Sequence, residues 1–238
     1  MKKEILVCIF YLSSMCILDA SIPDIVLSEI TYESMKDDPY TDHVRVFKQL
    51  FDRVEISSMV EFGLGVGTKF FLDNVDRVIS IEMLCADQTD EWYNYCIELY
   101  KGYSNWSQNL FQGSSLITWA NRAVIRGEDP ALVNPAYLLE LEQAVSIALV
   151  QPVELVFVDC DVHNRGDIVN LLFNKVDIIV AHDTKTLGKN VYGWEKILPP
   201  ANYHRFMFTK GQGIVFWVKD NRSDVMEVLQ TMVDSNQY

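Results

Sequence analysis

The segment Glu61 to Gly67 (Glu-Phe-Gly-Leu-Gly-Val-Gly) combines a carboxylate with glycines at 63, 65 and 67. Glycine has no Cβ, so such a loop can turn sharply and let a ligand approach the backbone. An apolar run precedes the loop and helix-like residues follow it. In such a turn from a strand to a helix, the free backbone amides at the start of the helix point at the ligand. We therefore predict that Glu61, Gly63, Gly65 and Gly67 bind a cofactor. The alternative is an ordinary tight turn between a strand and a helix.

A second carboxylate, Glu82, ends the next apolar run, which starts at Arg77. An acidic side chain at this position can accept hydrogen bonds from both hydroxyls of a ribose. Together with the glycine loop it indicates a cofactor that contains a nucleoside. The alternative is that Glu82 only caps the segment after it.

Acidic and imidazole side chains follow two further apolar runs: Asp159, Asp161 and His163 after one, and His182 and Asp183 after the other. The carboxyl ends of strands line the ligand crevice of an open α/β sheet, so we expect these groups to face one another. They could bind a divalent cation or poise a base against a hydroxyl substrate. We predict Asp159, Asp161, His182 and Asp183 as metal ligands, and His163, His182 and Asp159 as catalytic residues. The alternative is that Asp161 and Asp183 cap the helices after them.

Short apolar runs are predicted to be the strands that position these groups. Helix-like segments separate the first five, as a parallel sheet requires, whereas only Lys210-Gly211-Gln212 separates the last two, which indicates a hairpin. We therefore predict an α/β fold with a Rossmann-like doubly wound sheet of five parallel strands that ends in an antiparallel hairpin. The predicted strands are Ser58 to Phe62, Val78 to Met83, Asn109 to Gln112, Glu154 to Asp159, Asp177 to Ala181, Arg205 to Thr209 and Gly213 to Val218.

The rest of the chain gives weaker signals. Residues 21–40 are predicted to be an irregular lead-in to a domain at 41–238, and Thr41-Asp42 to cap a helix whose apolar face starts at Val44. Residues 116–150 are long for one crossover, so they are predicted to hold two helices, the second from Ala136 to Leu149, and to form a possible cap over the pocket. Cys85, Cys96 and Cys160 are predicted to be free buried thiols, because their spacing fits neither a metal site nor a disulfide framework.

The pattern Glu61-x-Gly63-x-Gly65-x-Gly67, followed by Val-Ile-Ser-Ile-Glu82, resembles class I S-adenosylmethionine-dependent methyltransferases, whose sheet has seven strands. The resemblance implies that the glycine loop lies along the methionine part of this cofactor and that Glu82 holds its ribose. Ser114 stands where the family often has an aspartate beside the adenine. A hydroxyl can still make one hydrogen bond there.

The cluster at residues 159–163 and 182–184 resembles the metal-assisted branch, which includes catechol-type O-methyltransferases and cephalosporin-hydroxylase-like proteins. Here one extra residue precedes His163, and His182 replaces an acidic residue, which favours transition metals over magnesium. The resemblance spans about Val60 to Val218. It implies S-adenosylmethionine as cofactor, with a divalent metal as a second candidate, and methyl transfer to the oxygen of a small hydroxylated acceptor.

Two other functions stay open on the sequence alone. A nicotinamide-dependent oxidoreductase would also use Gly-x-Gly and a second-strand acid, although the hairpin and Glu61 argue against it. The other is an exported, non-catalytic binding module on the same fold. Titration with S-adenosylmethionine and with NAD distinguishes these functions.

Charge and the N-terminal segment indicate partners and location. The net charge of −13 disfavours nucleic acid, so the expected partner is a small-molecule acceptor; nothing indicates an oligomeric state. Residues 1–20 have the layout of a secretory signal, with Lys2-Lys3 ahead of an apolar stretch from Ile5 to Leu18. We expect export, to a periplasm or the medium, with no membrane span after cleavage. A cytoplasmic or membrane-anchored chain is the alternative.

Overall fold

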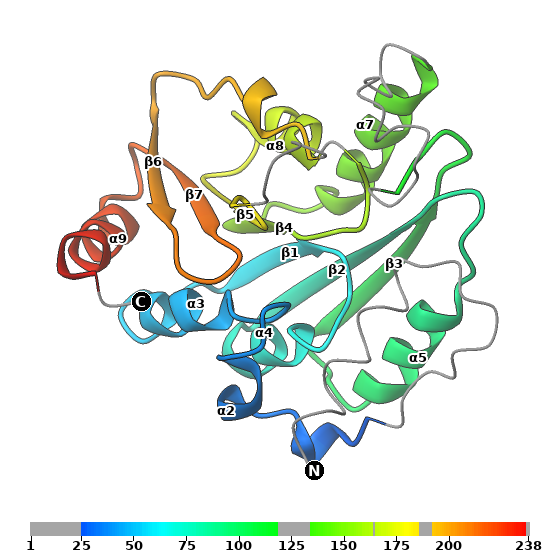
Figure 1. Cartoon of the computed structure of the whole chain (residues 1–238), viewed down its shortest axis with the longest axis horizontal. Helices are drawn as coiled ribbons and strands as arrows, with labels where there is room; N and C mark the ends of the chain where they lie inside the picture. Colours follow the sequence, from blue (N-terminus) through cyan, green and yellow to red (C-terminus); the bar gives the residue numbers. More distant parts are fainter. Residues whose placement is uncertain (1–24, 119–133, 164, 186–191, 237–238) are drawn as a thin grey trace.

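The computed structural model describes residues 25–118, 134–163, 165–185 and 192–236. The predicted signal at 1–20 and the first half of the predicted cap lie outside these residues. The predicted strands are all present, and they form one sheet in the order β3-β2-β1-β4-β5-β7-β6 (Figure 1). Their bounds are β1 Ser58–Phe62, β2 Arg77–Leu84, β3 Trp106–Gln112, β4 Leu155–Val158, β5 Ile178–His182, β6 Tyr203–Phe208 and β7 Ile214–Lys219.

Strand direction follows the sequence prediction. β1 to β5 pair in parallel, and β7 runs antiparallel to both β5 and β6. The Lys210–Gln212 segment makes the hairpin between β6 and β7, with Gly211 at a φ of 61° and Gly213 at 84°. The predicted Rossmann-like sheet with a terminal antiparallel hairpin is therefore confirmed.

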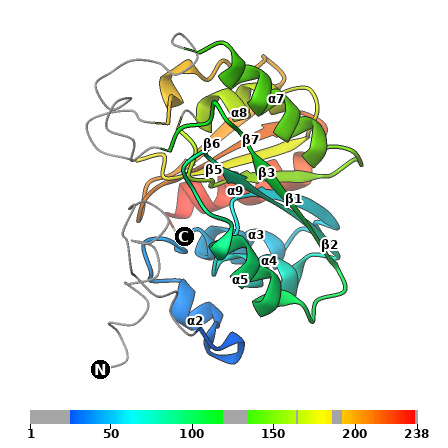
Figure 2. The same ribbon diagram turned by 90° about the vertical axis from the view of Figure 1, so that its right-hand side faces the viewer.

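Helices cover both faces of the sheet (Figure 2). One face carries η1 (Leu27–Glu29), α2 (Tyr32–Met35), α3 (Val44–Phe51), α4 (Thr68–Asn74), α5 (Glu91–Tyr100) and α9 (Ser223–Ser235). The other carries α7 (Ala136–Ala148), α8 (Arg165–Leu172) and η2 (Trp194–Lys196). Within the described residues, no helix is long and apolar enough to cross a membrane.

The central strands β1, β4 and β5 read as continuous apolar runs because both of their faces are buried, whereas the edge strands β3 and β6 carry exposed residues. In β4, Leu155 and Phe157 point into the core under α3 and α4, while Val156 and Val158 point into the core under α7 and α8. Because successive side chains of a strand point to opposite faces of the sheet, β4 contributes side chains to both cores. Cys85, Cys96 and Cys160 are free and buried, as predicted.

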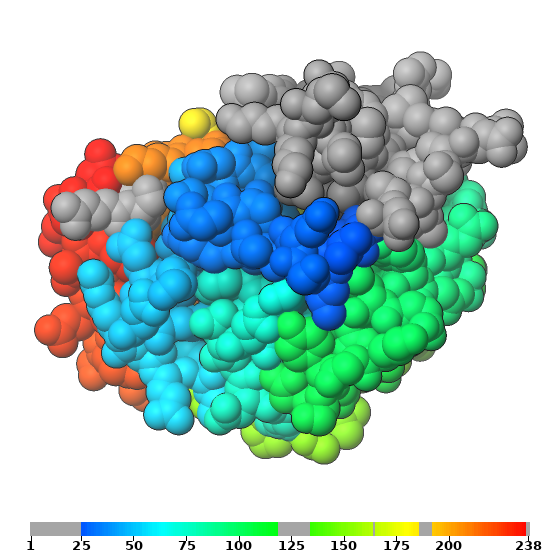
Figure 3. All heavy atoms as spheres, turned by 90° about the horizontal axis from the view of Figure 1, so that it is seen from below, coloured from blue at the N-terminus to red at the C-terminus, as the bar shows by residue number. Residues whose placement is uncertain are grey.

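The start of α3 differs from the prediction. The helix is present, but its N-cap is His43, and neither Thr41 nor Asp42 caps it. The Thr41 hydroxyl donates to the Met35 carbonyl oxygen at 2.8 Å, and the Asp42 carboxylate turns toward the sheet edge. The segment around Thr41 and Asp42 therefore packs over the carboxyl ends of the strands. The segment that begins at residue 25 (blue in Figure 3) lies across one face of the molecule, beside the cyan segment.

Candidate active site

The glycine loop turns directly beneath the end of β4. Gly63 has a φ of 99°, and a Cβ built on it would lie 2.7 Å from the Asp159 carbonyl oxygen. A Cβ on Gly67 would lie 2.9 Å from Nε2 of His43. Glycine is therefore required at 63 by both conformation and space, whereas a Cβ at 67 would press against the ring of His43.

Side chains hold this loop in place. The Leu64 amide donates to Glu82 Oε2 at 2.7 Å, and the Gly65 amide donates to the Thr68 hydroxyl at 3.0 Å. The Tyr100 hydroxyl donates to the Gly65 carbonyl oxygen at 2.8 Å. The loop is thus fixed before any ligand arrives, as a preorganised binding site requires.

Glu61 is a buried carboxyl at the base of the loop, with 2 % of its surface exposed. Burial raises its pKa to about 8, although hydrogen bonds from Ser80 and Thr68 act in the opposite direction. The Ser80 hydroxyl donates to Oε1 at 2.5 Å. A cationic group brought against Glu61 would favour its ionised form.

Glu82 is likewise buried, and burial raises its pKa to about 8 against the smaller effect of the Leu64 amide. The nearby charges of Asp161 and Glu61 raise it further. One oxygen of Glu82 holds the loop, so the predicted contact to a ribose falls to the rest of the carboxylate. That role stays a prediction.

Ser114, the residue predicted beside the adenine, is exposed and lies against α7. Its amide and hydroxyl donate to Glu140 Oε1 at 3.1 and 3.0 Å, and the Ser115 amide donates to Oε2 at 2.8 Å. The sequence gave no indication of Glu140. It brings a carboxylate to the turn that contains Ser114 and Ser115.

A pocket of about 40 Å³ lies between residues 40–43 and the glycine loop. This volume exceeds the share of one liquid water, about 30 Å³. Its polar wall carries both Glu61 and Asp159. The full lining comprises Tyr40, Thr41, His43, Glu61, Gly63, Leu64, Gly65, Gly67, Thr68, Phe71, Phe157 and Asp159.

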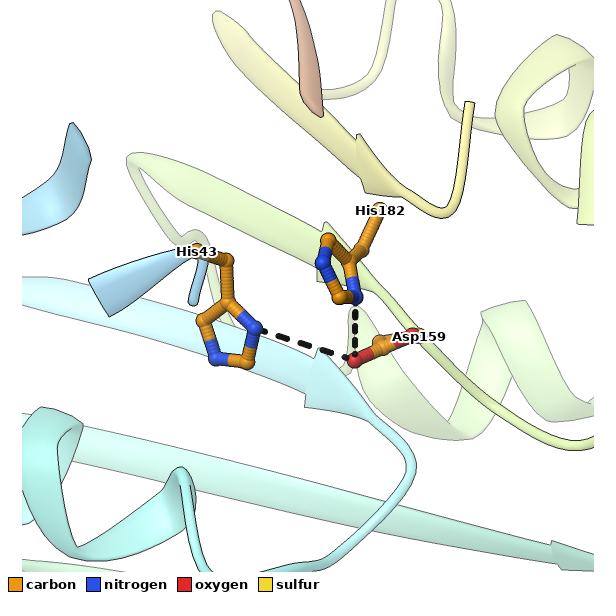
Figure 4. A group of neighbouring side chains, drawn as sticks. All are labelled: His43, Asp159 and His182. Atoms are coloured by element: carbon orange, nitrogen blue, oxygen red, sulfur yellow. Dashed lines mark hydrogen bonds and ion pairs between the residues drawn. The ribbon is translucent and has the colours of Figure 1, made fainter. Parts of the chain in front are cut away.

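Two imidazoles and a carboxylate meet beside this pocket (Figure 4). Candidate ligand atoms of His43, Asp159 and His182 all lie within 4.8 Å of one another, a grouping that could hold a metal ion. Asp159 and His182 were predicted from the sequence. His43 was not, because it directly precedes the helix α3 and does not follow a strand.

His182 is held between two carboxylates. Its Nε2 lies 2.9 Å from Asp42 Oδ1, and its Nδ1 lies 3.2 Å from Asp159 Oδ2. Burial acts to lower the pKa of His182, but the charges of Asp159 and Asp183 and the two hydrogen bonds outweigh it and raise the pKa well above its ordinary value. His182 therefore carries a proton in this arrangement.

Arg165 provides a fixed positive charge at the same edge. Its Nη1 lies 2.9 Å from Asp159 Oδ1 and 3.0 Å from Asp183 Oδ2, and its guanidinium lies 4.0 Å from the centre of the Tyr192 ring. Asp183 adopts a φ of 60°, which is unusual for a residue other than glycine. Arg165 thus occupies the space between the two carboxylates that were predicted to share a metal.

The other predicted site residues lie elsewhere. Asp161 accepts a hydrogen bond from Gln88 Nε2 at 3.2 Å and acts on the pKa of Glu82, so it lies on the side of Glu82. The His163 amide donates to the Ile117 carbonyl oxygen at 2.8 Å, next to α7. The structure therefore joins Asp159 with His182 but does not bring Asp161, Asp183 and His163 into the grouping that could hold a metal.

This chain is similar to known proteins at the level of the fold. No family model matches the chain, and no curated protein matches its sequence. Among solved structures it is similar to a methyltransferase from Geobacter sulfurreducens, with 14% identity over 88% of this chain and 93% of that chain and a TM-score of 0.46.

Two other similar structures contain SAH. A methyltransferase from Podospora anserina shares 12% identity over 84% of this chain and 90% of that one, with a TM-score of 0.47. An O-methyltransferase from Bacillus cereus shares 14% identity over 90% of this chain and 97% of that one, with a TM-score of 0.46. The strand order itself gives the conclusion: this chain has the seven-stranded, Rossmann-like fold of methyltransferase type.

Proposed function

We propose that this protein is an S-adenosylmethionine-dependent methyltransferase that methylates an oxygen of a small hydroxylated acceptor. The observation that carries the proposal is the glycine loop flanked by two buried carboxyls, Glu61 and Glu82, at the carboxyl ends of β1 and β2. In an open α/β sheet this edge is where ligands bind. The SAH bound in two of the similar structures agrees with this cofactor but does not carry the proposal.

Each part of the cofactor has a proposed partner in this chain. The ammonium group of the methionine would enter the pocket and meet Glu61, where a positive charge compensates the cost of ionising a buried carboxyl. The ribose would reach Glu82, and the adenine would lie toward Ser114 and Glu140. When bound, the cofactor supplies an electrophilic methyl group on sulfur.

The size of the pocket limits how the cofactor can sit. Sites that enclose drug-sized ligands have volumes of about 300 Å³ or more. The pocket of about 40 Å³ therefore fits only the amino-acid end. We propose that the nucleoside lies over the glycine loop outside it and that residues 40–43 shift when the cofactor enters.

The acceptor hydroxyl would lie near Asp159 and His182. Transfer forms an oxygen–methyl bond and breaks the sulfur–methyl bond, and the hydroxyl proton must leave. We propose that Asp159 receives this proton and that the protonated His182 ring, hydrogen-bonded to Asp159 Oδ2 at 3.2 Å, holds the carboxylate in place for the transfer. His163 stays a predicted catalytic residue.

The test uses cofactor with a labelled methyl group. The full-length chain should transfer label to catechol-like hydroxylated compounds, and His182→Gln should lower the rate about 10²-fold or more, the usual range for general acid–base groups. Exposed His204, which pairs with Asp220, provides a matched control as His204→Gln. Transfer to amines but to no hydroxylated compound would contradict the choice of acceptor.

Export remains a proposal that rests on residues 1–20 alone. N-terminal sequencing of the protein from its natural host would test it. A mature chain that begins shortly after residue 20 supports a cleaved signal, and an intact Met1 contradicts it.

A further inference from the structure

The side chains of His43, Asp159 and His182 have the spacing of metal ligands. In a tetrahedral site with bonds of about 2.1 Å, ligand atoms lie about 3.4 Å apart. Here Asp159 Oδ2 lies 3.2 Å from His182 Nδ1 and 4.0 Å from His43 Nδ1. All the candidate ligand atoms lie within 4.8 Å of one another, so a movement of about 1 to 1.5 Å by the His43 ring would close the site around an ion.

His43 has no other evident role for its polar atoms. It is 4 % exposed, and in the described part of the chain neither ring nitrogen has a hydrogen-bond partner. Its ring packs among Phe47, Phe71 and Phe157, with centroids 6.1, 5.9 and 4.7 Å away. A buried imidazole without hydrogen bonds costs stability, so a phenylalanine would suit this position better if nothing bound there.

The groups around the ligands already have the arrangement of an outer coordination shell. Metal-binding histidines usually give their second N–H to a carboxylate, and Asp42 stands 2.9 Å from Nε2 of His182. Asp42 is itself held by the Gln212 amide, which donates to Oδ2 at 3.2 Å. On the other side of the centre, Arg165 holds Oδ1 of Asp159 and leaves Oδ2 for the ion.

The charges at this centre are compatible with a cation. Asp42, Asp159 and Asp183 bring three negative charges to the sheet edge, and Arg165, Arg45 and the protonated His182 ring bring three positive ones. A metal ion would take the place of the Nδ1 proton of His182, because metal ligands must be deprotonated.

We propose that His43, Asp159 and His182 bind a divalent transition-metal ion such as Zn²⁺, Co²⁺ or Fe²⁺. Two imidazoles and one carboxylate select such ions over Mg²⁺, which prefers oxygen ligands. A three-residue site leaves a coordination position open, and the adjoining pocket can supply it with a water molecule or a ligand atom. The ion would also link His43, at the start of α3, to the carboxyl ends of β4 and β5.

This site differs from the one predicted from the sequence. It includes His43 and excludes Asp161 and Asp183, the second of which is paired with Arg165. The proposed site shares Asp159 and His182 with the proposed methyl transfer, but its test measures metal binding alone, so the two proposals can fail separately.

The experiment is a titration of the full-length, chelator-treated chain with Co²⁺, followed by absorbance, and with Zn²⁺ and Mg²⁺, followed by calorimetry. We expect one equivalent of Co²⁺ with visible bands of a four- or five-coordinate site, and Zn²⁺ binding much tighter than Mg²⁺. Absence of stoichiometric binding, or a preference for Mg²⁺, would overturn the proposal.

Variants locate the ion. His43→Phe, which suits the surrounding aromatic rings, should lower Zn²⁺ affinity at least tenfold, Asp42→Asn should lower it by about 10- to 100-fold, and His204→Gln should leave it unchanged. Equal affinity in wild type and His43→Phe would overturn the site. If His43→Phe does not fold, anomalous X-ray scattering at the zinc edge replaces it: a peak between these side chains supports the proposal, and a peak only elsewhere overturns it.

Discussion

Replacing Glu61 with Gln should stabilise the protein without cofactor in a strongly pH-dependent way. Gln keeps the shape of the side chain and an oxygen that can accept from Ser80, but it cannot ionise. Burial raises the pKa of Glu61 from 4.5 to about 8, so the folded chain retains a proton that the unfolded chain has already released. Stability from this group is therefore fully present below pH 4.5 and is lost as the pH rises toward 8.

The size of the effect follows from the shift. Each pH unit between 4.5 and 8 costs wild type about 1.4 kcal/mol relative to the variant, so Glu61→Gln should be more stable by about 3 kcal/mol at pH 7. For a chain of this length that corresponds to a rise in Tm of roughly 6 to 12 °C. Glu82 also has a raised pKa, but it is present in both proteins and largely cancels in the comparison.

The assay is urea unfolding of wild type and Glu61→Gln at pH 4.5, 6, 7 and 8. The difference in unfolding free energy should be near zero at pH 4.5 and grow with pH. A constant difference, or one that shrinks as pH rises, would refute the assignment of Glu61 as a buried, protonated carboxyl.

Three further substitutions probe other contacts. Gly63→Ala should destabilise by about 3 kcal/mol or more, measured by urea unfolding, because its φ of 99° and the 2.7 Å approach to a backbone oxygen both oppose a Cβ; an unchanged midpoint would contradict this. Arg165→Met should cost about 3 kcal/mol in urea unfolding, because it leaves the carboxylates of Asp159 and Asp183 without the guanidinium they share; an unchanged unfolding free energy argues against charge pairing. Glu82→Gln keeps an acceptor for the loop amide and should weaken cofactor binding by about 1 to 2 kcal/mol in calorimetry, whereas unchanged affinity would remove the ribose contact.

The centre of the sheet was predictable because its strands are buried on both faces. Runs such as Leu155–Val158 leave no room for polar residues, so their bounds show directly in the sequence. Gly63 was also predictable, because its conformation and its close approach to the Asp159 backbone leave glycine as the residue that fits. The hairpin was predictable because three residues cannot make a crossover.

The site was predictable only in part, because its remaining residues meet through the fold. Asp42 and His182 are 140 residues apart, and no local pattern links them. Thr41-Asp42 before an apolar helix resembles a cap, and that local interpretation hid the contact of Asp42 with His182. Arg165 begins α8 and gives no signal of the carboxylates it joins.

Asp161 shows the opposite error. Its spacing from Asp159 suggested a shared centre, but β4 ends at Val158, so both residues lie in the loop beyond it. Strand alternation no longer governs where their side chains point, and Asp161 turns to Gln88. Spacing therefore located the correct edge of the sheet without determining which side chains meet there.

Calorimetric titration of the full-length chain with S-adenosylmethionine, with NAD in a parallel experiment, tests the central claim most directly. At pH 7, S-adenosylmethionine should bind with one-to-one stoichiometry and release a proton, seen as a dependence of the heat on the ionisation enthalpy of the buffer, because Glu61 ionises beside the ammonium group. NAD should give no binding. No heat with S-adenosylmethionine, or tighter binding of NAD, would contradict the account.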